Sequence, residues 1–87
     1  MEAKSTLYIH NLSDGIGMDK LRSNLFLLFS MYGEVIDIRL DGRQLRGQAF
    51  IRMSTPDEAN LARITLNGEP FFGQPLKIEF SKNEMTV

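Results

Sequence analysis

The 87-residue sequence contains no cysteine, no tryptophan and a single histidine, His10. Without cysteine there is no disulfide framework, no thiolate metal site and no cysteine nucleophile, and one histidine does not build a metal site alone. No apolar run approaches the roughly 20 residues that span a bilayer, and the N-terminus lacks the charged-then-apolar layout of a signal peptide. We therefore expect a soluble, intracellular chain with no cofactor, no metal and no membrane contact.

Basic charge is also scarce for a chain that would bind nucleic acid. The ten Lys and Arg residues are outnumbered by eleven Asp and Glu residues, which gives a net charge of −1. This matters because neutralisation of phosphates supplies most of the affinity for nucleic acid. The only basic patch lies in residues 39–52, where a single acid, Asp41, accompanies these arginines: Arg39, Arg43, Arg46 and Arg52.

Hydrophobic periodicity predicts six elements and no interdomain linker. Alternating apolar residues predict strands at 6–12, 34–40, 45–53 and 75–80. Helical spacing predicts one helix from residue 18 to Gly33 and a second between a Thr55 cap, with Pro56 in its first turn, and a stop at Asn67–Gly68. The order βαββαβ indicates an α+β, ferredoxin-like sandwich with a four-stranded antiparallel sheet and both helices on one face. We expect this domain to span residues 6–82, between tails at 1–5 and 83–87.

One face of that sheet is predicted to be bare. Alternation places the following residues inward: Leu7, Ile9, Ile36, Ile38, Leu40, Ala49, Ile51, Met53, Leu76, Ile78 and Phe80. It places another set on the face that no helix covers: Tyr8, His10, Arg46, Gln48, Phe50 and Arg52. Two exposed aromatic rings on a flat sheet predict a partner that also has a planar face.

Two short motifs on neighbouring strands agree with this prediction. The octamer "RGQAFIRM" (46–53) matches the pattern of the RNA recognition motif at Arg46, Gly47, Ala49 and Phe50, and departs from it at Gln48 and Met53. The hexamer "LYIHNL" (7–12) matches the companion motif, so the chain resembles the RNA recognition motif family. Tyr8 and Phe50 would each stack a base, which is worth on the order of 1–3 kcal/mol per base. The weaker alternative is an ordinary ferredoxin-like core in which the two rings merely pack across strands.

Longer stretches sharpen this resemblance. Between Thr6 and Lys82, "LRSNLFLLFSMYGEV" and "FGQPLKIEFSK" resemble the spliceosomal snRNP proteins A and B-double-prime (B''), and most of all the single-domain B'' form of the U2 snRNP. The resemblance implies a non-catalytic nuclear protein of pre-mRNA splicing that binds the loop of U2 snRNA hairpin IV. It puts these residues at RNA-contacting positions: Tyr8, Asn11, Arg46, Gln48, Phe50, Lys77, Glu79, Ser81 and Lys82. Four more residues are candidate RNA contacts because they lie on the open face or in the basic segment: His10, Arg39, Arg43 and Arg52.

Departures from the family pattern predict weak RNA binding by the chain alone. The turn after the first strand carries Gly15, Gly17 and Met18 where family members often carry lysine, and Glu79 stands where glutamine would repel phosphate less. The resemblance implies assistance from a leucine-rich-repeat A-prime protein. Phe26 and Leu27 fall outside the predicted apolar stripe of the first helix, so they are the candidate contacts with that partner. A wide core stripe or simple surface scatter is an equally weighted explanation.

Other functions have less support. An acylphosphatase-type enzyme on this fold needs an arginine in the loop after the first strand, and "NLSDGIGMD" has none. No set of acid, base and nucleophile emerges, so we expect neither catalysis nor a small-molecule substrate. A U1 snRNP A-type hairpin binder and a protein-binding variant of the RNA recognition motif remain as alternatives, the second supported by the net charge of −1.

Overall fold

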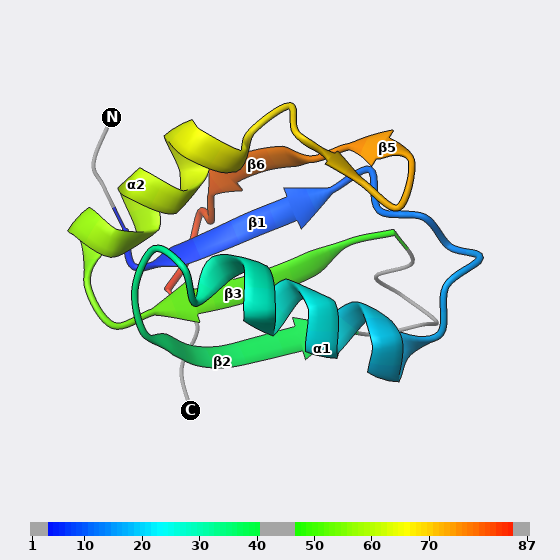
Figure 1. The fold of residues 1–87 in the computed structure, drawn as a ribbon. Coiled ribbons are helices and arrows are strands. Elements are labelled where there is room, and N and C mark those ends of the chain that lie inside the picture. The colour runs from blue at the N-terminus through cyan, green and yellow to red at the C-terminus, as the bar shows by residue number, and fades with distance from the viewer. Residues whose placement is uncertain (1–3, 41–46, 85–87) are drawn as a thin grey trace.

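The computed structural model describes residues 4–40 and 47–84. Its elements are β1 (Thr6–His10), α1 (Met18–Phe29), β2 (Val35–Leu40), β3 (Ala49–Met53), α2 (Pro56–Leu66), β4 (Pro70–Phe71), β5 (Gln74–Pro75) and β6 (Lys77–Phe80). Four strands form an antiparallel sheet in the order β2-β3-β1-β6, and β4 and β5 form a separate small hairpin (Figure 1). The predicted ferredoxin-like arrangement is confirmed.

The core lies between the sheet and the two helices, which cover the same face of it (Figure 1). The inward residues of the central strands are fully buried, as predicted for Leu7, Ile9, Ala49, Ile51 and Met53. The helices contribute Leu25 and Phe29 from α1 and Ala59, Ala62 and Leu66 from α2. The small alanine side chains let α2 lie close to the sheet, and the opposite face is left for other contacts.

Strand β2 corrects one prediction. Val35 pairs with Met53 and Asp37 pairs with Arg52, so Ile36 is an extra residue in a β-bulge. Because a bulge reverses the alternation of side chains on its two sides, Val35 packs against the core and Ile36 is 44% exposed. The expectation that Ile36 points inward is therefore wrong, while Ile38 is buried as predicted.

Helix α1 ends four residues before the predicted stop at Gly33. Phe29 is its last residue, and the amides of Met31 and Tyr32 donate to the carbonyls of Leu28 and Phe29 in tight turns. Gly33 has a different role, since a Cβ atom there would lie 2.6 Å from the Cβ of Glu58. The absent side chain lets Glu58 approach and accept a hydrogen bond at 2.8 Å from the Glu34 amide. The glycine thus joins the end of α1 to the start of α2.

Helix α2 begins and ends as predicted. Thr55 Oγ1 accepts a hydrogen bond from the Glu58 amide at 3.1 Å, and Pro56 occupies the first turn. Gly68 follows the last residues of the helix with φ +89°, a conformation that favours glycine. Phe71 in the hairpin packs against the core.

Candidate nucleic-acid interface

Three rings form the centre of the open sheet face. Tyr8 on β1 and Phe50 on β3 are register partners, and their ring centroids are 5.3 Å apart with a 37° tilt. The His10 ring is stacked beside Tyr8, with centroids 5.0 Å apart and an interplanar angle of 12°. All three side chains are half-buried on the face away from the helices. We call Tyr8, His10 and Phe50 the aromatic platform.

Two hollows flank Tyr8 at the edges of the platform. One, of about 390 Å³, is lined by Tyr8, His10, Asn11, Leu12, Asp14, Gly47 and Gln48. The other, of about 550 Å³, is lined by Tyr8, Gln48, Phe50, Glu79, Phe80, Ser81, Lys82 and Asn83. Amide, carboxylate, hydroxyl and ammonium groups therefore surround an aromatic floor, an arrangement suited to hold a base and its sugar-phosphate.

The predicted cationic residues that the structure describes lie around this floor. Arg39 on β2 is the register partner of Phe50, and Lys77 on β6 is the register partner of His10. Arg52 on β3 is the register partner of Thr6 on β1 and of Asp37 on β2. Lys82 lines the larger hollow. Arg43 and Arg46 lie outside the described residues.

Two of the predicted contact residues already have partners within the fold. The Asn11 side chain donates through Nδ2 to the Pro75 carbonyl at 2.9 Å, and its backbone has φ +67°, which asparagine tolerates better than most residues. Ser81 is only 6% exposed, and its hydroxyl donates to the Asn83 carbonyl at 2.7 Å. Asn11 directly follows β1 and Ser81 directly follows β6, so both side chains hold the chain in place where these strands end.

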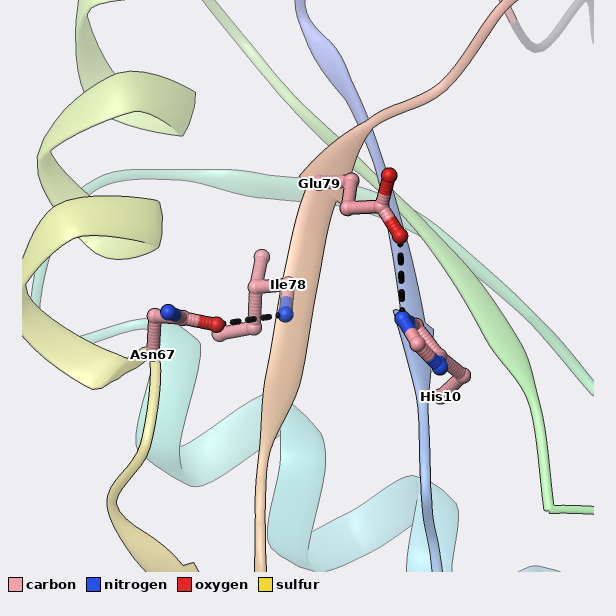
Figure 2. A network of polar contacts seen from close by, with 4 residues as sticks. All are labelled: His10, Asn67, Ile78 and Glu79. Atoms are coloured by element: carbon pink, nitrogen blue, oxygen red, sulfur yellow. Dashed lines mark hydrogen bonds and ion pairs between the residues drawn. The ribbon is translucent and has the colours of Figure 1, made fainter.

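The sequence placed His10 on the open face and the family resemblance put Glu79 at an RNA-contacting position, but neither showed that the two side chains meet. Figure 2 shows their side chains facing each other from β1 and β6, and His10 Nε2 lies 3.0 Å from Glu79 Oε2. Because a carboxylate only accepts, the histidine donates this hydrogen bond. The sequence pattern indicates that both side chains point outward from their strands. Only the register of β1 against β6 shows that the two side chains are close enough to bond.

A second surface lies beside α1, apart from the platform. A groove of about 500 Å³ is lined by Arg22, Ser23, Phe26, Leu27, Val35, Ile36, Asp37 and Ile38. Phe26 is 49% exposed and Leu27 is 66% exposed, and the bulge in β2 adds Ile36 to the same apolar surface. The Arg22 guanidinium donates to the Ile38 carbonyl at 2.6 Å and so ties α1 to the sheet edge. We call this surface the α1–β2 groove.

Residues 4–40 and 47–84 contain neither a cluster of metal ligands nor a helix that could span a membrane. These ranges hold no group of three or more His, Asp or Glu side chains placed to bind a metal ion. Neither of the helices found there is long and apolar enough to cross a membrane.

Comparison with known proteins agrees with this geometry. Residues 3–87 match the family model of the RNA recognition motif, also called the RRM, RBD or RNP domain. The chain is 38% identical over 85 residues to a probable U2 small nuclear ribonucleoprotein B'' of Schizosaccharomyces pombe, covering 97% of the chain and 77% of that protein. It is 34% identical over 88 residues to U1 small nuclear ribonucleoprotein A of Drosophila melanogaster, covering all of the chain and 41% of that protein.

Further relatives support the same grouping. A U2 small nuclear ribonucleoprotein B'' of Dictyostelium discoideum is 39% identical over 80 residues, covering 91% of the chain but only 33% of that protein. The chain thus spans less than half the length of the fly and Dictyostelium relatives. Among solved structures, a complete computational redesign of human U1A protein superposes with a TM-score of 0.87 at 30% identity, covering 98% of this chain and 90% of that one. The chain therefore belongs to the RNA recognition motif family and, within it, to the RNA-binding spliceosomal snRNP A and B'' proteins.

Proposed function

We propose that the chain is a non-catalytic component of the U2 snRNP in pre-mRNA splicing, and that it acts in the nucleus by binding the loop of U2 snRNA hairpin IV. The Tyr8–Phe50 pair, half-exposed on a helix-free sheet face, carries this proposal. Relatives named U2 B'' in fission yeast and Dictyostelium support the choice of the U2 particle. The alternative of a U1 A-type binder draws support from the fly relative.

Each part of the platform would have a distinct role in holding the RNA. Loop bases are unstacked and splayed, so they can stack on Tyr8 and Phe50. Gln48 can both donate and accept, which suits it to read a base edge from the floor of either hollow. The cationic residues Arg39, Arg52, Lys77 and Lys82 would meet phosphates, as would Arg43 and Arg46.

A leucine-rich-repeat A-prime protein would dock on the α1–β2 groove through Phe26 and Leu27. Support comes from the exposure of these two side chains and from the position of the groove, which leaves the platform free for RNA. A net charge of −1 limits phosphate attraction, so additional protein contacts would be needed for tight binding.

The partner surface is tested by a double variant, Phe26→Ser with Leu27→Ser, in a pull-down with the purified A-prime protein. We expect capture to be lost because two apolar contacts are removed. Leu61→Ser with Ile64→Ser is the matched control, since these exposed residues lie on α2. Capture by a folded Phe26/Leu27 variant at the level of the original protein would exclude this docking site.

The RNA proposal is tested by binding to U2 hairpin IV and U1 hairpin II at fixed salt, with and without the A-prime protein. We expect U2-selective binding that tightens with the partner. Phe50→Leu should weaken binding by about 5- to 100-fold because it removes one stacking ring, whereas Phe72→Leu, in the turn between β4 and β5, should not. Equal or tighter binding to the U1 hairpin without the partner would favour the A-type alternative. Absence of RNA binding under every condition would favour a protein-binding variant.

A further inference from the structure

Glu79 places a negative charge directly beside the ring on which a base would stack. It is the register partner of Tyr8 across β1 and β6, a relation that brings two side chains to within about 5 Å at their Cβ atoms. It also lines the 550 Å³ hollow together with Tyr8 and Phe50. A base stacked on Tyr8 would therefore present an edge to this carboxylate.

The carboxylate is held in this position. His10 Nε2 donates to Oε2 at 3.0 Å, and the histidine ring is itself stacked on Tyr8 at 5.0 Å. The Glu79 side chain nonetheless stays 63% exposed, and Figure 2 shows its second oxygen pointing away from His10. If Glu79 served only to repel phosphate, no such orientation would be needed. The observed contacts instead fix an acceptor at the rim of the platform.

The charged residues around Glu79 leave its carboxylate free to accept hydrogen bonds from a base. Lys77 is the register partner of His10, and Lys82 lines the same hollow as Glu79. In the described part of the chain, the His10 ring is the one side chain within hydrogen-bond distance of the Glu79 carboxylate. The two lysines can therefore attract the phosphates on either side while Glu79 faces the base between them.

The chemistry of a carboxylate decides which base fits. An ionised carboxylate only accepts hydrogen bonds, so it favours an edge that offers adjacent N–H donors. The Watson–Crick edge of guanine offers an imino N–H and an amino group side by side, which two carboxylate oxygens can accept together. Uracil offers one N–H between two carbonyl oxygens, and both carbonyls would repel the carboxylate.

We propose that Glu79, positioned by His10, makes the platform select guanine over uracil at the loop nucleotide that stacks on Tyr8. This inference rests on the proposed function, because it names the base that the same RNA-binding face prefers. The role of Glu79 is therefore to confer specificity, at some cost in attraction to the RNA backbone.

The test uses the full chain and a set of U2 hairpin IV RNAs in which each loop nucleotide is changed in turn to each of the four bases. Affinities are measured for the original protein, for Glu79→Gln and for Glu69→Gln, a matched charge change on an exposed residue between α2 and β4. At one loop position we expect the original protein and Glu69→Gln to prefer guanine to uracil by about ten-fold. Glu79→Gln should lose that preference, because an amide both donates and accepts.

The possible outcomes separate this inference from the proposed function. If Glu79→Gln strengthens binding to all loops by the same factor, the carboxylate only repels phosphate and the inference fails. An unchanged guanine preference in Glu79→Gln would overturn it as well. In both cases a loss of binding in Phe50→Leu would leave the proposed function standing. Absence of RNA binding by the original protein would remove both.

Discussion

At the scale of single residues, Gly33 is the glycine of the described ranges at which an added Cβ would lie closest to its neighbours. An added Cβ would lie 2.6 Å from the Cβ of Glu58, a distance that forces a backbone or helix shift. We expect Gly33→Ala to lower the free energy of unfolding by about 1–3 kcal/mol, the usual range for overpacking. Urea denaturation at pH 7 measures this.

Gly15→Ala is the control for that variant. The nearest atom to a Cβ at position 15 is the Ser13 hydroxyl at 3.8 Å, an ordinary contact. Its stability should stay within about 0.5 kcal/mol of the original protein. Equal losses in the two variants would show that glycine at 33 is not needed for the approach of Glu58.

Glu58 also makes stability depend on pH. Hydrogen bonds from the Ser54 hydroxyl and from the Glu34 amide hold the pKa of Glu58 below its ordinary value of 4.5. A lowered pKa in the folded state gives a stabilising contribution that is complete above about pH 4.5 and is lost as the pH falls through the folded-state pKa.

We therefore expect Glu58→Gln to be less stable than the original protein at pH 7, by a difference that shrinks as the pH falls below about 4.5. Urea denaturation of both proteins from pH 7 to pH 3 measures the difference. Glu69→Gln serves as the control, because its difference in unfolding free energy from the original protein should not show the same dependence on pH. A loss of unfolding free energy in Glu58→Gln that stays the same from pH 7 to pH 3 would contradict the assigned role of the carboxylate.

At the scale of elements, the free edge of β6 is covered by the segment that follows α2. Asn67 Oδ1 accepts from the Ile78 amide at 2.8 Å, on the side of β6 opposite His10 (Figure 2). Gly68 and Glu69 pair with the backbone of Leu76 at 2.7 and 2.9 Å. A covered edge does not offer its amides to another strand, which protects the sheet against unwanted pairing.

Asn67→Ala should therefore loosen this edge. Losing the hydrogen bond should cost about 1 kcal/mol of unfolding free energy, and hydrogen exchange of the Ile78 amide should accelerate. Gln74→Ala, on exposed β5, should leave both quantities unchanged. Unaltered exchange at Ile78 in Asn67→Ala would show that the side chain does not protect the edge.

The elements also show where sequence reasoning succeeds and where it stops. Alternation is a local property, and it correctly predicted the buried faces of β1 and β3 and the outward direction of Tyr8 and Phe50. The inward direction of Ile36 was predicted wrongly, because a bulge depends on how two strands pair rather than on one strand's pattern. The His10–Glu79 contact was missed for the same reason, since residues 69 positions apart meet only through register.

At the scale of the whole molecule, the fold keeps two surfaces apart. The platform lies on the open face of the sheet, and the α1–β2 groove lies where the helix meets the sheet edge. The start of β1 is also joined to the segment that follows β6. The Glu84 carboxylate accepts hydrogen bonds from the amides of Ser5 and Thr6 at 3.2 and 3.0 Å. The surface proposed for the RNA loop and the surface proposed for the protein partner therefore do not overlap.

The charge distribution of the molecule sets how its RNA binding responds to salt. With Arg39, Arg43, Arg46, Arg52, Lys77 and Lys82 as the candidate phosphate contacts, we expect four to six neutralised phosphates and a slope of log Kd against log salt of about 3–4. Lys82→Ala should reduce that slope by about 0.7, while Lys20→Ala should not, since the Lys20 ammonium lies near the Phe72 ring instead. Titrations of hairpin IV at several salt concentrations measure the slope. A slope near zero would mean that stacking alone holds the RNA, and an unchanged slope in Lys82→Ala would remove Lys82 from the phosphate contacts.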